Sequence, residues 1–122
     1  MTTRQKVLGD LAENTAQTFL TKNGLKLIEK NYQCYWGEID LIMEGKEHIV
    51  FIEVRYRKDS PYASAVESIT PAKMQRIIKT ATNYLQNKQT LHKVNSRFDV
   101  IAIQHDKNKP TIRWIKNAFN NS

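Results

Sequence analysis

The spacing of hydrophobic and polar residues shifts between the period of a helix and that of a strand along the first half of the chain. In residues 4–22 hydrophobic positions recur at helical spacing, which predicts an amphipathic helix. Asn23-Gly24 follows, and Gly24 is suited to the left-handed conformation that ends a helix. Two-residue alternation then predicts strands at 25–35, 38–43 and 48–57, which short turns join into a meander.

The second half opens with a polar segment, residues 58–69, which we expect to form a loop. Thr70 followed by Pro71 then favours a helix start, because threonine caps the free amides and proline fits the first helical position. Residues at helical spacing predict the buried side of this helix: Met74, Ile77, Ile78, Ala81, Tyr84 and Leu85.

After a polar connection, alternation predicts two further strands, at 97–104 and 111–115. Residues 117–122 are expected to be a frayed tail. The predicted order is therefore α-β-β-β-α-β-β, in a single domain of residues 1–116. We expect an α/β fold with one mixed five-stranded sheet flanked by helices.

Composition narrows the function classes. The chain has 122 residues, of which 40% are hydrophobic and 25% charged, as expected for one globular domain. Its formal net charge of +7 attracts polyanions, with nucleic acid first and an anionic membrane surface second, and charge alone does not separate these partners from a generically basic, well-solvated surface. No apolar run has signal-peptide or membrane-spanning length, and Cys34 is the only cysteine, so we expect a cytoplasmic protein without a membrane partner.

Two acidic residues on neighbouring predicted strands are the strongest candidates for chemistry. Alternation places Ile39, Leu41 and Met43 on one face of the second strand and Asp40 with Glu38 on the other. In the third strand Glu53, Arg55 and Arg57 share a face, opposite Val50, Ile52, Val54 and Tyr56. If these two strands pair through the intervening turn, the carboxyl groups of Asp40 and Glu53 lie side by side.

Two carboxylates about 4 Å apart repel by roughly 4 kcal/mol at an effective dielectric constant near 20. A proton, an arginine or a divalent cation must offset that repulsion. Mg²⁺ suits the last case, with the backbone carbonyl of Val54 as a further oxygen ligand, and such an ion supports phosphodiester hydrolysis. The alternative is a solvated strand face on which Glu53–Arg55 and Asp40–Arg57 form ordinary ion pairs, and spacing alone favours that alternative.

Several blocks together resemble a known family. The blocks are GEIDLI at 37–42, FIEVRYR at 51–57, Lys73 and RFDV at 97–100, and Gly9, Ala12, Glu13 and Ala16 in the first helix fit the same pattern. They resemble the YraN family of small bacterial proteins over nearly the whole chain. That resemblance implies a restriction-endonuclease-like fold, similar to the PD-(D/E)xK nucleases and the Holliday-junction resolvases.

By position, the resemblance makes Asp40 and Glu53 ligands of Mg²⁺ or Mn²⁺ and Glu13 the carboxylate of the first helix. Arg55 occupies the place of the catalytic lysine, and Ile39 stands where the motif has proline. Arginine stays protonated and cannot act as a base, although it can clamp a phosphate. The departure at Arg55 therefore leaves a non-cleaving nucleic-acid-binding module of the same fold as the alternative to a nuclease.

Basic and aromatic residues near these carboxylates predict contacts to nucleic acid. Lys73, Arg76 and Lys79 recur along the second predicted helix, and Arg57 with Lys58 extends the row toward the acidic pair. Such a row can track phosphates, although many charge rows are only solvated faces.

Four other side chains have two interpretations each. Glu38 can assist a metal through an outer-shell water or pair with an arginine. Tyr35 and Trp36 can stack on an unpaired base, with core or edge packing as the safer interpretation. Asp99 is expected to form a salt bridge to Arg97 or Arg113 rather than to act in catalysis.

The leading hypothesis is a metal-dependent endonuclease that hydrolyses phosphodiester bonds in DNA, with branched or damaged DNA as candidate substrates. DNA is favoured over RNA, and recognition is expected to depend on backbone and shape rather than on sequence. The alternatives are the non-cleaving module and an adaptor whose basic surface contacts another protein. By analogy with resolvases, which cut two strands, a homodimer is expected.

Overall fold

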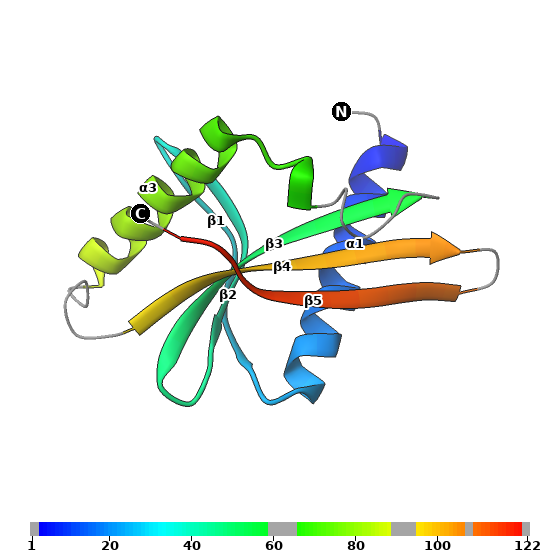
Figure 1. Ribbon diagram of the computed structural model, residues 1–122, viewed down its shortest axis with the longest axis horizontal. Coiled ribbons are helices and arrows are strands. Elements are labelled where there is room, and N and C mark those ends of the chain that lie inside the picture. The colour runs from blue at the N-terminus through cyan, green and yellow to red at the C-terminus, as the bar shows by residue number, and fades with distance from the viewer. Residues whose placement is uncertain (1–2, 59–65, 89–94, 107–108, 121–122) are drawn as a thin grey trace.

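A computed structural model describes residues 3–58, 66–88, 95–106 and 109–120 of the chain (Figure 1). Its elements are α1 (Thr3–Lys22), β1 (Lys26–Cys34), β2 (Gly37–Glu44), β3 (His48–Lys58), α3 (Pro71–Asn87), β4 (Asn95–Asp106) and β5 (Lys109–Phe119). One five-stranded sheet has the order β1-β2-β3-β4-β5, in which β3 and β4 run parallel and the other neighbours antiparallel. This confirms the mixed α/β sheet and the element order expected from the sequence.

The two helices cover opposite faces of the sheet. In β3, Val50 and Ile52 pack in the cluster that contains α1, whereas Phe51, which lies between them, packs in the cluster that contains α3. In Figure 1 the twisted sheet runs through the middle of the molecule, with α3 at the upper left and α1 behind β3, β4 and β5. A side chain that stands on β3 is therefore directed toward one helix or the other.

The end of α1 is fixed by the glycine cap that the sequence predicted. Gly24 has a φ of 97°, which a side-chain-bearing residue rarely adopts. The amide of Gly24 donates to the carbonyl of Thr21 at 3.2 Å, and the amide of Leu25 donates to that of Leu20 at 3.1 Å. This pair of bonds is a Schellman motif, which stops the helix and directs the chain into β1.

Only part of the hydrophobic stripe of α1 is buried. Ala12, Ala16 and Leu20 lie in the core, whereas Leu11 is 56% exposed. Val7 and Leu8, on the preceding turns, are exposed as well. The helical spacing therefore predicted the helix correctly, but burial begins only at its middle.

The start of α3 also follows the sequence. Thr70 is the N-cap, its Oγ1 accepts a hydrogen bond from the amide of Lys73 at 3.1 Å, and Pro71 opens the helix. The predicted buried side is confirmed at Ile77, Ile78, Ala81, Tyr84 and Leu85, with Thr80 also buried and Met74 half-buried. The cap fixes the first turn of α3, which contains Lys73.

The face assigned to Ile39 was wrong. Ile39 packs with Ile42 in the α3 cluster, whereas Leu41 and Met43 pack in the α1 cluster. Strict alternation would have placed Ile39 with Leu41, so the alternation of β2 breaks at Asp40. Opposite this position, Asn31 of β1 has a φ of 52°, and no Asn31–Asp40 pair occurs in the β1–β2 register.

The expected frayed tail is also corrected for residues 117–119, which belong to β5. The ring of Phe119 stacks on that of Phe98, with centroids 5.1 Å apart and planes at 18°. This aromatic contact adds hydrophobic burial that a tail in solvent would lack, so the strand continues. Residues 121–122 lie outside the described part of the chain.

Candidate active site

The site forms where β2 and β3 separate. The two strands pair from Glu44–Ile49 up to Leu41–Ile52, and the pairing ends before Asp40. The Oδ2 atom of Asp40 accepts a hydrogen bond from the backbone amide of Val54 at 2.8 Å. The side chain of Asp40 thus takes the place of a main-chain partner and lies beside Glu53.

Asp40 lies close enough to Glu53 for the two carboxyl groups to interact. Burial, followed by the charge of Glu53, raises the pKa of Asp40 well above its ordinary value of 3.8. The Glu53 side chain is only 7% exposed, so solvent screens this repulsion weakly. The structure therefore brings together the two carboxyl groups that the strand spacing placed side by side, and burial with the charge of Glu53 favours the protonated form of Asp40.

Glu13 of α1 approaches the same pair. Burial raises the pKa of Glu13 above its ordinary value of 4.5, and its charge in turn raises the pKa of Asp40. The Nδ2 atom of Asn31 donates to Oε1 of Glu13 and to Oε1 of Glu38, each at 3.0 Å. Glu38 is exposed and also accepts from Gln33 at 3.2 Å, so its observed partners are amides rather than an arginine.

Sequence reasoning missed Asn31. It has a positive φ between the Lys30–Leu41 and Tyr32–Ile39 pairs, and its amide donates to both Glu13 and Glu38. Asparagine is among the few residues that tolerate this backbone region, which is the only sequence feature that could have indicated the kink.

Two cations reach the buried carboxylate from different elements. One nitrogen of the Arg55 guanidinium lies 3.3 Å from Oε2 of Glu53, and the Lys73 ammonium lies 3.7 Å from the same oxygen. The Nε atom of Arg55 is buried without a hydrogen-bond partner in the described part of the chain. Lys73, expected along a phosphate path, therefore lies directly at the carboxylate, because the first turn of α3 rests over this part of the sheet.

The solvated-face alternative is only partly met. The Glu53–Arg55 ion pair that it required is present, but Glu53 is buried rather than solvated. The observed partner of Asp40 is the amide of Val54. Arg57 and Lys58 end β3, and their side chains lie outside the described part of the structure. The Asp40–Arg57 pair and the basic extension through Lys58 thus remain predictions.

The donor atoms decide which metal the site could hold. Within the described residues, no group of three or more His, Cys, Asp or Glu side chains could hold a metal ion. Asp40 and Glu53 offer carboxylate oxygens, and the carbonyl predicted as a further ligand belongs to Val54, whose amide binds Asp40. Mg²⁺ commonly binds through one or two carboxylates and keeps several waters, so this oxygen set fits Mg²⁺ or Mn²⁺.

The predicted basic row lies on the solvent side of α3. Arg76 and Lys79 are exposed, and the helix (Pro71–Asn87) contains no acidic residue. The Lys79 ammonium lies 4.6 Å from the centre of the Trp36 ring. Tyr35 is 91% exposed, so of the core or edge packing that the sequence favoured, core packing does not apply to this residue.

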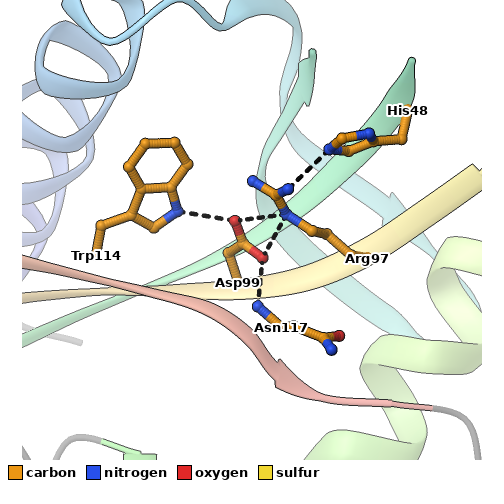
Figure 2. A network of polar contacts seen from close by, with 5 residues as sticks. All are labelled: His48, Arg97, Asp99, Trp114 and Asn117. Atoms are coloured by element: carbon orange, nitrogen blue, oxygen red, sulfur yellow. Dashed lines mark hydrogen bonds and ion pairs between the residues drawn. The ribbon is translucent and has the colours of Figure 1, made fainter. Parts of the chain in front are cut away.

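Asp99 has a structural role on the other face of the sheet. It pairs in register with Ile52, which packs against α1, whereas Glu53 faces α3. Figure 2 shows the fully buried carboxylate held by Arg97 (3.1 Å), the indole of Trp114 (2.8 Å) and the amide of Asn117 (2.9 Å). The expected salt bridge to Arg97 is confirmed, and Arg97 also contacts His48 at 2.8 Å.

The fold and the site together define an α/β protein with a carboxylate cluster at the split between two central strands and a basic helix beside it. Residues 12–103 match the model of the Uncharacterised protein family UPF0102, and the chain belongs to that family. This confirms the family resemblance carried by the sequence blocks. None of the described helices is long and apolar enough to cross a membrane.

Relatives in several bacteria match nearly end to end. A UPF0102 protein of Nitrosococcus oceani is 46% identical over 111 residues, which cover 91% of this chain and 90% of that protein. A UPF0102 protein of Coxiella burnetii is 48% identical over 112 residues, covering 92% and 91%. One of Vibrio parahaemolyticus is 44% identical over 115 residues, covering 94% and 93%.

Proposed function

We propose that this protein is a metal-dependent endonuclease that hydrolyses phosphodiester bonds in DNA, with branched or damaged DNA as candidate substrates and without sequence-specific binding. The observation that carries the proposal is the position of Asp40 at the split of β2 and β3, where its carboxylate binds the amide of Val54, the residue next to the buried Glu53. A fold retains such a repulsive pair where a cation or proton is to be bound.

Asp40 and Glu53, with the carbonyl of Val54, would hold Mg²⁺ or Mn²⁺. When bound, that ion lowers the pKa of a coordinated water and neutralises charge that develops on the phosphate. Glu13 lies near enough to Asp40 to influence its charge, and from α1 it can orient the attacking water. In the reaction, water adds to phosphorus, one P–O ester bond breaks, and the departing sugar oxygen takes up a proton.

Lys73 can supply the amine that is missing because arginine, at residue 55, occupies the position of the catalytic lysine. Arg55 cannot accept a proton at neutral pH, but it can bind two phosphate oxygens at once. Lys73 comes from α3 rather than from β3, yet its ammonium lies near the same oxygen of Glu53. The site thus contains a lysine at the carboxylate despite the substitution at residue 55, and this favours cleavage.

The second candidate is a module of the same fold that binds nucleic acid without cutting it. The observation that favours it is that Glu53 forms ion pairs with both Arg55 and Lys73. A carboxylate that is paired with two cations is less available to bind a metal. In this alternative the acidic pair and its cations form a structural network, and the basic face of α3 binds the nucleic acid.

Cleavage assays separate the two candidates. The purified protein is incubated with single-stranded, duplex, flap and four-way-junction DNA and with RNA, in Mg²⁺, Mn²⁺ or EDTA. We expect metal-dependent cutting that Asp40→Asn and Glu53→Gln each reduce by at least about 100-fold. The matched control is Glu44→Gln, which changes an exposed carboxylate at the far end of the same strand.

The role of Lys73 is tested in parallel. Lys73→Met should reduce the maximal rate by about 100-fold or more, whereas Lys88→Met, at the other end of α3, should leave it unchanged. Binding that persists with no cutting in either metal would favour the non-cleaving module. Cutting that survives in Asp40→Asn would place the chemistry elsewhere and refute the proposed site.

A further inference from the structure

The turn between β1 and β2 exposes two large aromatic side chains. Tyr35 is 91% and Trp36 is 42% exposed, and no other aromatic side chain in the described part of the chain is as open to solvent. Their rings contact edge to face, with centroids 5.1 Å apart and planes at 82°. Exposed aromatic surface is unfavourable in water, so a pair that is both exposed and ordered suggests a ligand.

The turn is held in place rather than free to collapse onto the surface. Gly37 has a φ of 150°, and a Cβ added to it would lie 3.5 Å from Oγ1 of Thr80. The turn therefore lies directly against α3. The amide of Trp36 donates to Sγ of Cys34 at 3.4 Å, and Lys79 lies over the indole ring. A platform fixed in this way loses little conformational freedom when a ligand binds.

The surroundings of the aromatic pair suit a nucleobase with its phosphates. Lys73 at the carboxylates and Lys79 at Trp36 are six residues apart on α3, a separation of about 9 Å along the helix, with Arg76 between them. Beside Trp36 lies an open hollow of about 360 Å³, lined in part by the amide side chains of Gln75, Asn83 and Gln86. Amides can both donate to and accept from the edge of a base.

We infer that Tyr35 and Trp36 form a stacking platform for an unpaired base, and that the preferred nucleic acid has a single-stranded segment next to the carboxylate site. Bases inside a duplex have both faces covered, whereas an unpaired base can lie on an aromatic ring. The cations of α3 bind the phosphates between the platform and Glu53. This inference rests on the nucleic-acid binding proposed above and specifies which form of nucleic acid is bound.

The test is binding without cleavage, in EDTA and at low salt. Fluorescence anisotropy measures the affinity of the full-length protein for a labelled 12-nucleotide single strand and for the blunt duplex of the same sequence. Tyr35→Ala should weaken binding of the single strand by about 5- to 150-fold, the range measured for loss of one stacked base. The affinity for the duplex should change by less than about twofold, and Tyr35→Phe should bind like the wild type because the ring is kept.

Two further variants serve as controls. Leu11→Ala removes an equally exposed hydrophobic side chain from α1 and should leave both affinities unchanged. Lys79→Ala removes a cation from the phosphate path and also the contact over Trp36, so it should weaken the single strand at least as much as the duplex and make binding less dependent on salt. Thermal melts of each variant establish that the fold is retained.

Three results would overturn the inference: unchanged binding of the single strand by Tyr35→Ala, equal losses for single strand and duplex, or no measurable binding of either probe. A change from dimer to monomer in Tyr35→Ala, with both affinities unchanged, would assign the pair to a subunit interface and also overturn it. The expected binding pattern without any cutting would support the platform and refute the nuclease. Metal-dependent cutting by the wild type, together with equal losses of single-strand and duplex affinity in Tyr35→Ala, would support the nuclease and refute the platform.

Discussion

Replacing Asp40 with asparagine should make the metal-free protein more stable at neutral pH while abolishing its proposed activity. The pKa of Asp40 is raised above 3.8 in the folded state, so the folded protein binds the proton more tightly than the unfolded chain does. The contribution of Asp40 to the free energy of unfolding is then greatest below about pH 3.8, and it is lost as the pH rises through the range up to the folded-state pKa. Asparagine cannot ionise, and it therefore removes this loss.

The size of the effect has an upper limit. Keeping a carboxyl group protonated at pH 7, about three pH units above 3.8, costs about 1.4 kcal/mol per unit, or about 4 kcal/mol. Repulsion between two ionised carboxylates about 4 Å apart gives a similar figure. Asparagine keeps an oxygen for the amide of Val54 and gains an NH₂ group that can donate to Glu53. We therefore expect a gain of about 1–4 kcal/mol, with each kcal/mol raising the melting temperature by about 3–5 °C.

Thermal melts in EDTA from pH 4 to pH 8 measure this gain. The difference between Asp40→Asn and the wild type should be near zero at pH 4 and grow as the pH rises. Glu44→Gln should differ from the wild type by no more than about 0.5 kcal/mol at any pH. A variant no more stable than the wild type at pH 8, or a gain that does not change with pH, would refute the assignment of a repulsive carboxyl pair. Added Mg²⁺ should then stabilise the wild type but not Asp40→Asn.

Three other changes have expected outcomes. Asp99→Asn should destabilise the protein by about 3–5 kcal/mol in urea unfolding, because it leaves Arg97 without its buried carboxylate; a loss below about 1 kcal/mol would contradict this role. Gly37→Ala should lower stability by about 1–3 kcal/mol, since only glycine favours a φ of 150°, and a neutral result would show that the turn can move away from Thr80. Arg55→Lys should retain cutting within about tenfold of the wild type in the junction assay if the required lysine comes from α3, whereas a gain well above tenfold would mark a site that lacks one.

Local sequence features predicted the parts of the fold that local physics determines. Gly24 and the Thr70-Pro71 pair gave the end of one helix and the start of the next, because cap geometry depends on only a few adjacent residues. The short turn between β2 and β3 likewise sets the register that brings Asp40 next to Glu53, although the alternation of β2 breaks at Asp40 itself.

Long-range contacts explain what the sequence did not indicate. Lys73 lies 20 residues after Glu53, and only the packing of α3 on the sheet places it at that carboxylate. The contact of Phe119 with Phe98 likewise depends on the pairing of β5 with β4. The face of Ile39 was missed because the alternation of β2 breaks at Asp40, opposite the positive-φ residue Asn31 of β1, and nothing in the sequence of β2 itself shows that break.

The same irregularity has a consequence for how copies of this protein could meet. β1 and β5 form the two open borders of the sheet, and each has a register shift and an asparagine at positive φ, Asn31 in β1 and Asn117 in β5. Such kinks hinder another strand from docking along a border, which protects against uncontrolled fibre-like association. A symmetric pair of subunits, if one forms on a branched substrate, is therefore expected to join through side-chain surfaces and not by extending the sheet from one copy into the next.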